Sequence, residues 1–212
     1  MKLYFIFSNL NAIVLAIWTM FLIIVAIRYF RPDWVKNISY FKLLLIAIGL
    51  NIFYGLFVTW GQYHVWANGN QITKALLSSP LGKEVPLPFL LEWIRPLFEH
   101  SYGYFLFYVL GRTWLDTSLL FLISGAVYSL FRIWKSYRGG FLEQGPEILL
   151  ILMLASGYPG ILVFIPIGFI LAVLFSIYSS IRGKASINIE PAFIVAAFVA
   201  LIFAPAILNV LQ

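Results

Sequence analysis

The side chains in this sequence whose spacing could do chemistry are carboxylates. Only eight of the 212 residues are Asp or Glu, so each can be weighed separately. Asp33, Glu143 and Glu147 flank apolar runs on what the charge pattern predicts to be one side of a membrane. Two carboxylates brought together there could activate a water molecule, one as base and one as acid. The competing interpretation is that all three are solvated loop charges or helix caps.

The other acids have simpler interpretations. Asp116 follows Arg112 by four residues, a spacing that allows an ion pair on one face of a helix. Asp116 could therefore serve as a structural anchor or as an acid within the membrane, and the sequence leaves both interpretations open. Glu190 precedes Pro191 and is expected to begin a helix, where a carboxylate favours the helix dipole. Solvation explains the remaining acids, which are Glu84, Glu92 and Glu99.

Metal and cofactor chemistry has little support in the sequence. His64 and His100 are the only histidines, and two histidines so far apart are a poor metal site. The sequence has no cysteine, which excludes disulfides and thiolate ligands. It contains no phosphate-binding glycine loop and no metalloprotease motif. We therefore expect no cofactor and no resident metal.

The composition predicts an integral membrane protein. The chain is 62% hydrophobic and 10% charged, with a mean hydropathy of +0.95. Soluble domains are about 45–50% apolar and about 25% charged. The formal charge of +6 comes from basic residues that gather between apolar runs, as the positive-inside rule describes. Membrane lipids are thus the expected partners of this charge, and nucleic acid is not.

The apolar runs predict an all-α bundle of about six spans. Because basic clusters are expected on the cytoplasmic side, both termini are predicted to lie outside. One expected span is a short arm of about 16 residues from Leu142, roughly 24 Å long. The other expected spans are Leu10–Tyr29, Phe41–Trp60, Leu115–Trp134, Ile161–Tyr178 and Ala192–Val210.

Breaks in the pattern divide the chain into three segments. Residues 1–60 hold the first two spans, 61–112 form an extracytoplasmic or interfacial segment, and 113–212 form a four-span bundle. Within the middle segment, Asn68-Gly69-Asn70 is a turn signal. Residues 101–110 are expected to lie in the outer interface or to re-enter the membrane, and Gly111-Arg112 separates them from the next span. Other membrane subunits are expected to dock on the 61–112 segment.

Several short motifs resemble those of the prepilin peptidase family, the bacterial prepilin and archaeal preflagellin signal peptidases. They lie mainly between Leu115 and Phe203, and the six-helix arrangement with its N-terminus outside is also that of the family core. The motifs are Leu115-Asp116-Thr117 at the start of a span, Gly157-Tyr158-Pro159-Gly160 after a short arm, Ile189-Glu190-Pro191-Ala192-Phe193 before the last helix, and Arg31-Pro32-Asp33-Trp34 after the first span.

The sequence departs from this family at the positions of its catalytic aspartates. The first aspartate precedes the Pro-Asp element, and Val25 stands there in this chain. The second belongs to a Gly-x-Gly-Asp motif, which corresponds here to Gln144-Gly145-Pro146-Glu147. Only Glu147 or Glu143 could replace it, and without the first acid no dyad shares a proton. The segment from 61 to 112 is an insertion relative to the family, and the cysteine-rich domain of the bacterial enzymes is missing.

Three hypotheses follow from the sequence. In the first, the chain is a non-catalytic relative of prepilin peptidase in a prokaryotic cytoplasmic membrane, acting as a scaffold or assembly subunit. In the second, it is a divergent intramembrane aspartyl-type peptidase that uses Asp33 or Asp116 with Glu147 or Glu143. In the third, it is a small subunit of a large membrane complex, unrelated to peptidases. The vacated aspartate positions favour a protein that is not an enzyme.

Overall fold

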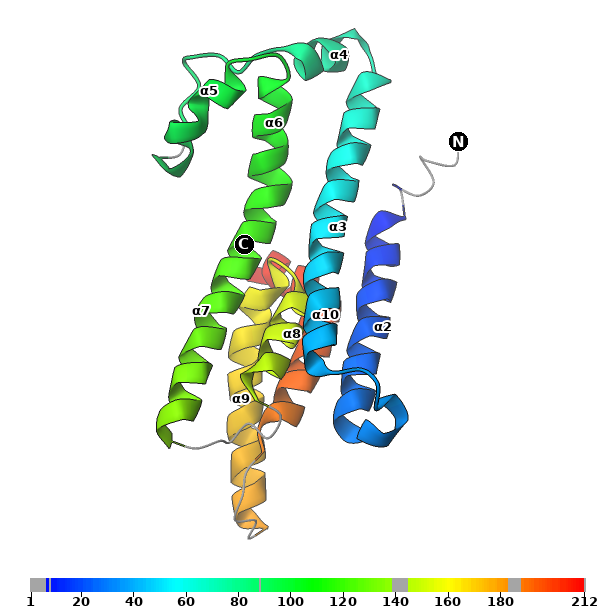
Figure 1. Ribbon diagram of the computed structural model, residues 1–212, viewed down its shortest axis with the longest axis vertical. Coiled ribbons are helices and arrows are strands. Elements are labelled where there is room, and N and C mark those ends of the chain that lie inside the picture. Colours follow the sequence, from blue (N-terminus) through cyan, green and yellow to red (C-terminus); the bar gives the residue numbers. More distant parts are fainter. Residues whose placement is uncertain (1–6, 8, 88, 139–144, 183–187, 212) are drawn as a thin grey trace. The chain divides into compact units, whose positions relative to one another are not determined.

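The computed structural model describes residues 7, 9–87, 89–138, 145–182 and 188–211. The chain is all-helical: 84% of the residues that the structure describes are in helices, and none of them is in a strand. In chain order, the elements of Figure 1 are α2 (Leu10–Phe30), η1 (Pro32–Val35), α3 (Tyr40–Ala67), α4 (Gln71–Ser78), η2 (Phe89–Ile94), α5 (Arg95–Phe98), α6 (Gly103–Val109), the π-helical turn η3 (Leu110–Trp114), α7 (Leu115–Arg138), α8 (Pro146–Ser156), α9 (Gly160–Ile181) and α10 (Glu190–Leu211).

Contacts within the chain define two compact units. The first unit is formed by Met1–Asn51 together with Leu119–Gln212, and the second unit by Ile52–Ser118. Helices α3 and α7 each contribute to both units. These bounds differ from those of the three segments predicted above, which stay a prediction.

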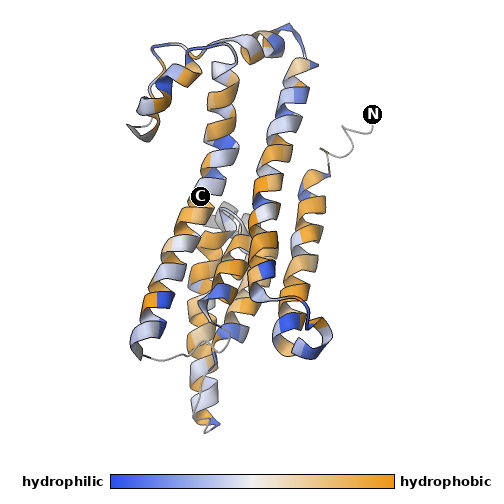
Figure 2. Ribbon diagram, in the orientation of Figure 1, coloured by the Kyte–Doolittle hydropathy of each residue, from blue (hydrophilic) through white to orange (hydrophobic). Residues whose placement is uncertain are grey.

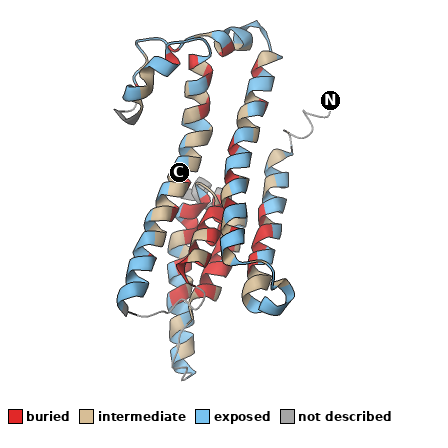
Figure 3. Cartoon of the chain, viewed as in Figure 1, coloured by how far each residue is buried: buried red, intermediate tan, exposed pale blue. Residues whose placement is uncertain are grey.

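Helix α8 is the centre of the first unit. Nearly all of its side chains are buried, with Ile151, Leu152 and Met153 completely so, and Figure 3 shows this concentration of buried residues. The partners that cover it come from α2, α9 and α10, since their apolar residues belong to the same cluster. With 11 residues, α8 is about 16 Å long at 1.5 Å per residue.

Helices α8 and α10 run parallel to each other. A Cβ atom added at Gly160 would lie 3.9 Å from Cβ of Ser156, the last residue of α8. It would lie 3.8 Å from Cβ of Ala204, far along α10. Because the late parts of both helices meet, both helices begin at one end of the unit. Glu147 and Glu190 occupy their first turns.

Two small apolar clusters hold the second unit together. Trp66 from α3, Leu77 from α4, and Phe105 and Val109 from α6 form one of them. The other consists of Leu81, Leu87 and Phe98 packed against α6. These clusters fix the connection between α3 and α6, so the segment is folded on itself.

Four stretches of helix are long and apolar enough to cross a membrane. They are Leu10–Phe30, Tyr40–Ala67, Gly103–Tyr137 and Gly160–Ile181, and the apolar residues that cover them are evident in Figure 2. Two further apolar stretches, Pro146–Ser156 and Glu190–Ala204, are shorter than this. The helices are thus compatible with a membrane protein.

The predicted break at Gly111-Arg112 is wrong. The chain stays helical from Gly103 to Tyr137, passing through Gly111 as part of a π-helical turn. A glycine inside a helix costs only about 1 kcal/mol relative to alanine, and packing of the flanking residues offsets it. In the same way α3 extends to Ala67, past the predicted end of its span at Trp60.

The predicted turns are confirmed at two places. α3 ends at Ala67, and Asn70 caps α4 by accepting a 2.9 Å hydrogen bond from the backbone N–H of Thr73. The helix α8 ends at Ser156, where Gly157 adopts a positive φ of 66°. A left-handed backbone conformation of this kind favours glycine.

Candidate functional site

Asp33 lies on the surface at the end of α2. Pro32 cannot continue that helix, because it has no backbone N–H, and it opens the short helix η1 instead. The side chain of Asp33 is 83% exposed and forms a 3.3 Å ion pair with Lys36. This is the geometry of a solvated loop charge, the competing interpretation considered for it from the sequence.

Glu147 is half-buried in the first turn of α8. It follows Gly145, which has a φ of 94° and no room for a side chain. The space that a Cβ at Gly145 would fill is taken by the Glu147 carboxylate, and Nζ of Lys135 lies 3.3 Å from the same point. Because Gly145 has no side chain, the Glu147 carboxylate and the Lys135 ammonium group can both lie close to the backbone at this position. Glu143 lies outside the described residues.

No hydrogen bond or ion pair joins Asp33 to Glu147 in the described part of the chain. The ion pair that Asp33 does form is with Lys36. The two acids belong to the first unit, at the end of α2 and the start of α8.

Asp116 is half-buried in the second unit, at the start of α7. The ion pair with Arg112 that the spacing allows is not among the ion pairs of the described residues; Arg112 donates a 2.8 Å hydrogen bond to the Tyr108 hydroxyl. The guanidinium also lies over the Tyr108 ring, 5.9 Å from its centroid.

The histidines are both exposed and belong to the second unit. The His64 ring stacks on Trp60 with centroids 5.8 Å apart, and the carbonyl oxygen of His100 accepts a hydrogen bond from Gly103. Over the ranges the structure describes, no three His, Cys, Asp or Glu side chains gather in a group that could hold a metal ion.

Glu190 is more deeply buried than its predicted role as a helix cap requires. It has no exposed surface, and its backbone N–H donates a 3.1 Å hydrogen bond to Oδ1 of Asn188. The Asn188 amide in turn donates a 2.6 Å hydrogen bond to the hydroxyl of Tyr29, near the end of α2. This link between α2 and the start of α10 was not predicted from the sequence. The signal for it is an asparagine, Asn188, two residues before Glu190 in an otherwise apolar stretch.

Asn51 is a second polar residue that the sequence reasoning missed. It is 8% exposed within α3, and its amide reaches the backbone carbonyls of Ala47 and Leu154. A single asparagine in an apolar helix is the signal that could have indicated it. Burial of an amide requires hydrogen-bond partners, which in this case tie α3 to α8.

The helices, their apolar surfaces and the buried polar links are those of a helical membrane protein. Comparisons with protein families, curated proteins and solved structures find no match for this chain.

Proposed function

We propose that the chain is a non-catalytic membrane protein related to the prepilin peptidases, which acts as a scaffold or subunit of an assembly in a prokaryotic cytoplasmic membrane. The observation that supports this most directly is the state of Asp33. This acid belongs to the Pro-Asp motif in which the chain resembles the family, yet it is exposed and paired with Lys36 on the surface. Together with Val25 at the position of the first aspartate, it leaves the family's site without an acid pair.

The proposed arrangement has six helices in the membrane and both termini outside. α2, α3, α7 and α9 have the length of a span. α10 has 22 residues, about 33 Å, which also suffices for a core about 30 Å thick. The short helix α8 would complete the set, with its polar start sunk among the other helices. The middle segment, 61–112, would then be presented outside as the docking surface for another membrane subunit.

A cleavage assay tests this proposal. The purified protein is reconstituted in vesicles of phosphatidylethanolamine and phosphatidylglycerol and incubated with a peptide that carries a prepilin-type leader. We expect no cleavage, whereas a prepilin peptidase with both aspartates cleaves the peptide under the same conditions. The proposal would be overturned if the unmodified protein cleaves the peptide and a Glu147→Gln variant does not. Stoichiometric co-purification with a membrane partner would support it.

A divergent peptidase is the second candidate, and the parallel packing of α8 and α10 favours it. Glu147 and Glu190 lie in first turns at one end of the first unit. Glu147 would take the place of the family's second aspartate, and Glu190 would supply the other acid in place of Asp33. This candidate predicts that Glu147→Gln and Glu190→Gln each abolish cleavage, whereas Asp33→Asn leaves it unchanged.

A further inference from the structure

Residues 81–87 and 89–98, here called the return segment, fold back along α6. Its two ends are joined by a 2.8 Å hydrogen bond from the N–H of Leu81 to the carbonyl oxygen of Phe98. Its buried side chains pack against Tyr104, Phe107 and Leu110. These three residues follow one another at intervals of three, so they form a stripe about 9 Å long on the helix. Within the second unit, Figure 1 shows η2 and α5 beside α6.

The stripe leads toward a tryptophan at the depth of a membrane surface. Trp114 donates a 3.1 Å hydrogen bond from its indole N–H to the hydroxyl of Thr59 on α3. The part of α3 from Tyr40 to Thr59 is about 29 Å long, and the hydrocarbon core of a bilayer is about 30 Å thick. In the proposed membrane arrangement, with the core beginning at Tyr40, Thr59 and Trp114 would lie at its outer edge, where tryptophan is enriched. Leu110 lies one turn from Trp114, so the return segment reaches this level.

The outer surface of the return segment is apolar. Trp93 is 80% exposed and Leu97, four residues later, is 61% exposed. Both belong to the short helices η2 and α5, from which Leu91, Ile94 and Phe98 join the apolar cluster on α6. An exposed large aromatic side chain beside an exposed aliphatic one is typical of segments that lie in a membrane interface.

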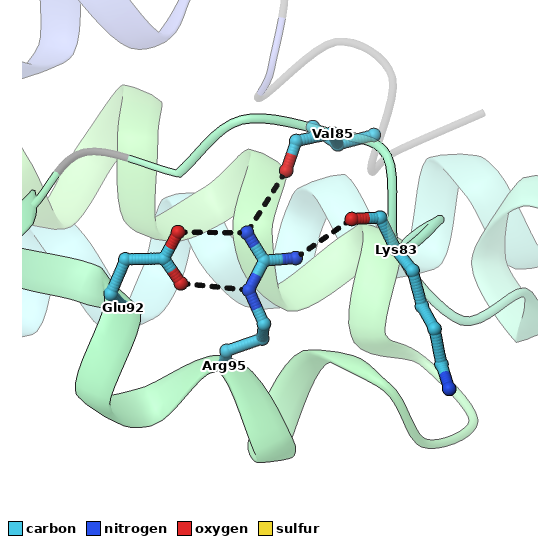
Figure 4. Close-up of polar contacts among 4 residues, drawn as sticks. All are labelled: Lys83, Val85, Glu92 and Arg95. Atoms are coloured by element: carbon cyan, nitrogen blue, oxygen red, sulfur yellow. Dashed lines mark hydrogen bonds and ion pairs between the residues drawn. The ribbon is translucent and has the colours of Figure 1, made fainter.

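Arg95 satisfies several polar groups of the return segment from within the segment. Figure 4 shows Arg95 holding the segment closed: its guanidinium donates two hydrogen bonds to Glu92, of 2.7 and 3.0 Å. The same guanidinium donates hydrogen bonds of 3.2 Å to the carbonyl oxygens of Lys83 and Val85. An exposed loop in contact with lipid would otherwise leave these carbonyls without partners, at a cost. The pairing also cancels the charges next to Trp93.

We propose that the return segment is an interfacial anchor, which inserts Trp93 and Leu97 into the headgroup region of the outer phospholipid leaflet. This inference rests on the proposed membrane arrangement and adds a lipid-binding surface to it. We expect lipid, and not a protein, to cover Trp93 and Leu97, because in this arrangement their surface lies at the level where the neighbouring helices leave the membrane. A protein partner would then dock on the other parts of the 61–112 segment.

The absence of cysteine from the sequence makes site-specific labelling a direct test. Trp93→Cys is labelled with the fluorophore NBD, and the protein is reconstituted in vesicles of phosphatidylethanolamine and phosphatidylglycerol. Glu84→Cys, at an exposed position of the same segment, is the matched control. Fluorescence quenching is measured with lipids that carry a doxyl group near the glycerol, and with iodide in the water.

At position 93 we expect blue-shifted emission, strong quenching by the doxyl lipid and weak quenching by iodide. The label at position 84 should show the reverse. Leu97→Cys provides a second probe of the same surface, should the Trp93 variant not fold. Iodide quenching at position 93 equal to that at position 84 would overturn the proposal. Protection from both quenchers would also overturn it, because a second copy of the chain would then cover the surface.

A fourth label separates this proposal from the membrane arrangement on which it depends. Ile170 lies in the middle of α9 and is 59% exposed. A label on Ile170→Cys should be quenched by doxyl groups deep in the acyl chains. Quenching at position 170 without quenching at position 93 refutes the anchor alone. Loss of quenching at both positions refutes the membrane arrangement, and peptide cleavage refutes only the non-catalytic role.

Discussion

The amide of Asn51 donates a 3.2 Å hydrogen bond to the carbonyl oxygen of Leu154, which lies 103 residues later in the sequence. The acceptor is in the last turn of α8, where carbonyl groups lack partners within the helix. The same amide also donates to the carbonyl of Ala47, one turn earlier in α3. One buried side chain therefore closes the end of the central helix and joins it to α3.

Replacement of this asparagine is the first prediction. Asn51→Ala leaves the Leu154 carbonyl buried without its partner, which costs about 1–3 kcal/mol of folding free energy. Asn68 is the matched control, because its amide also donates to a carbonyl four residues earlier but is exposed. Asn68→Ala should change stability by less than about 0.5 kcal/mol. Thermal unfolding in detergent measures both; equal losses would contradict the role given to Asn51.

The second prediction concerns the close approach of α9 and α10. A Cβ atom at Gly168 would lie 2.5 Å from Cδ1 of Phe193, whose ring is 2% exposed. The ring is enclosed by neighbours, so Gly168→Ala must push the helices apart, at a cost of about 1–3 kcal/mol. At Gly125 on α7 a Cβ meets nothing within 4 Å, so Gly125→Ala should instead stabilise the helix by up to about 1 kcal/mol. Unfolding of the two variants in detergent should shift in opposite directions.

The third prediction concerns the link between the ends of α2 and α10. Tyr29→Phe removes the hydroxyl that accepts the 2.6 Å hydrogen bond from Asn188. We expect a loss of about 0.5–1.5 kcal/mol, the usual net contribution of such a bond. Tyr137→Phe, at a residue that is 84% exposed, is the control and should change little. Hydrogen exchange of the first turn of α10 should increase in the Tyr29 variant, and unchanged exchange would refute the link.

Sequence patterns predicted where most helices begin and end, because the signals for these points are local. Pro32, Asn70 and Gly157 each stop or start a helix through their own backbone or side chain. The continuous helix through Gly111 was not predicted, since packing of its flanks outweighs the propensity of one glycine. Local chemistry dominates at the ends of helices, whereas packing dominates within them.

The candidate site was predictable only in part. Asp33 and Glu147 could be selected from the sequence as rare acids beside apolar helices. The partner of Asp33, Lys36, is three residues away in the sequence. The approach of Lys135 to Gly145 comes from another helix, so it depends on packing and could not be predicted. The hydrogen bonds of Asn51 and Asn188 cross 103 and 159 residues. No periodicity in one sequence encodes which distant carbonyl or hydroxyl such an amide will meet.

The last prediction is a pH dependence of the return segment. The hydrogen bonds from Arg95 hold the pKa of Glu92 below its ordinary value. A carboxylate with a lowered pKa stabilises the folded segment above its unfolded pKa, about 4.3 for Glu. That contribution is lost as the pH falls through the lowered pKa of the folded state. The segment should therefore stay closed at neutral pH and loosen only in acid, below about pH 4.

Hydrogen exchange of residues 81–87 as a function of pH, corrected for the intrinsic rate, measures this loosening. Glu92→Gln removes the titrating group, so its exchange should be faster at neutral pH and nearly independent of pH. Arg95→Lys keeps the charge but cannot form the paired hydrogen bonds of a guanidinium. It should therefore resemble Glu92→Gln. Exchange in Arg95→Lys equal to that of the unmodified chain would show that charge alone, and not the geometry of Arg95, holds the segment closed.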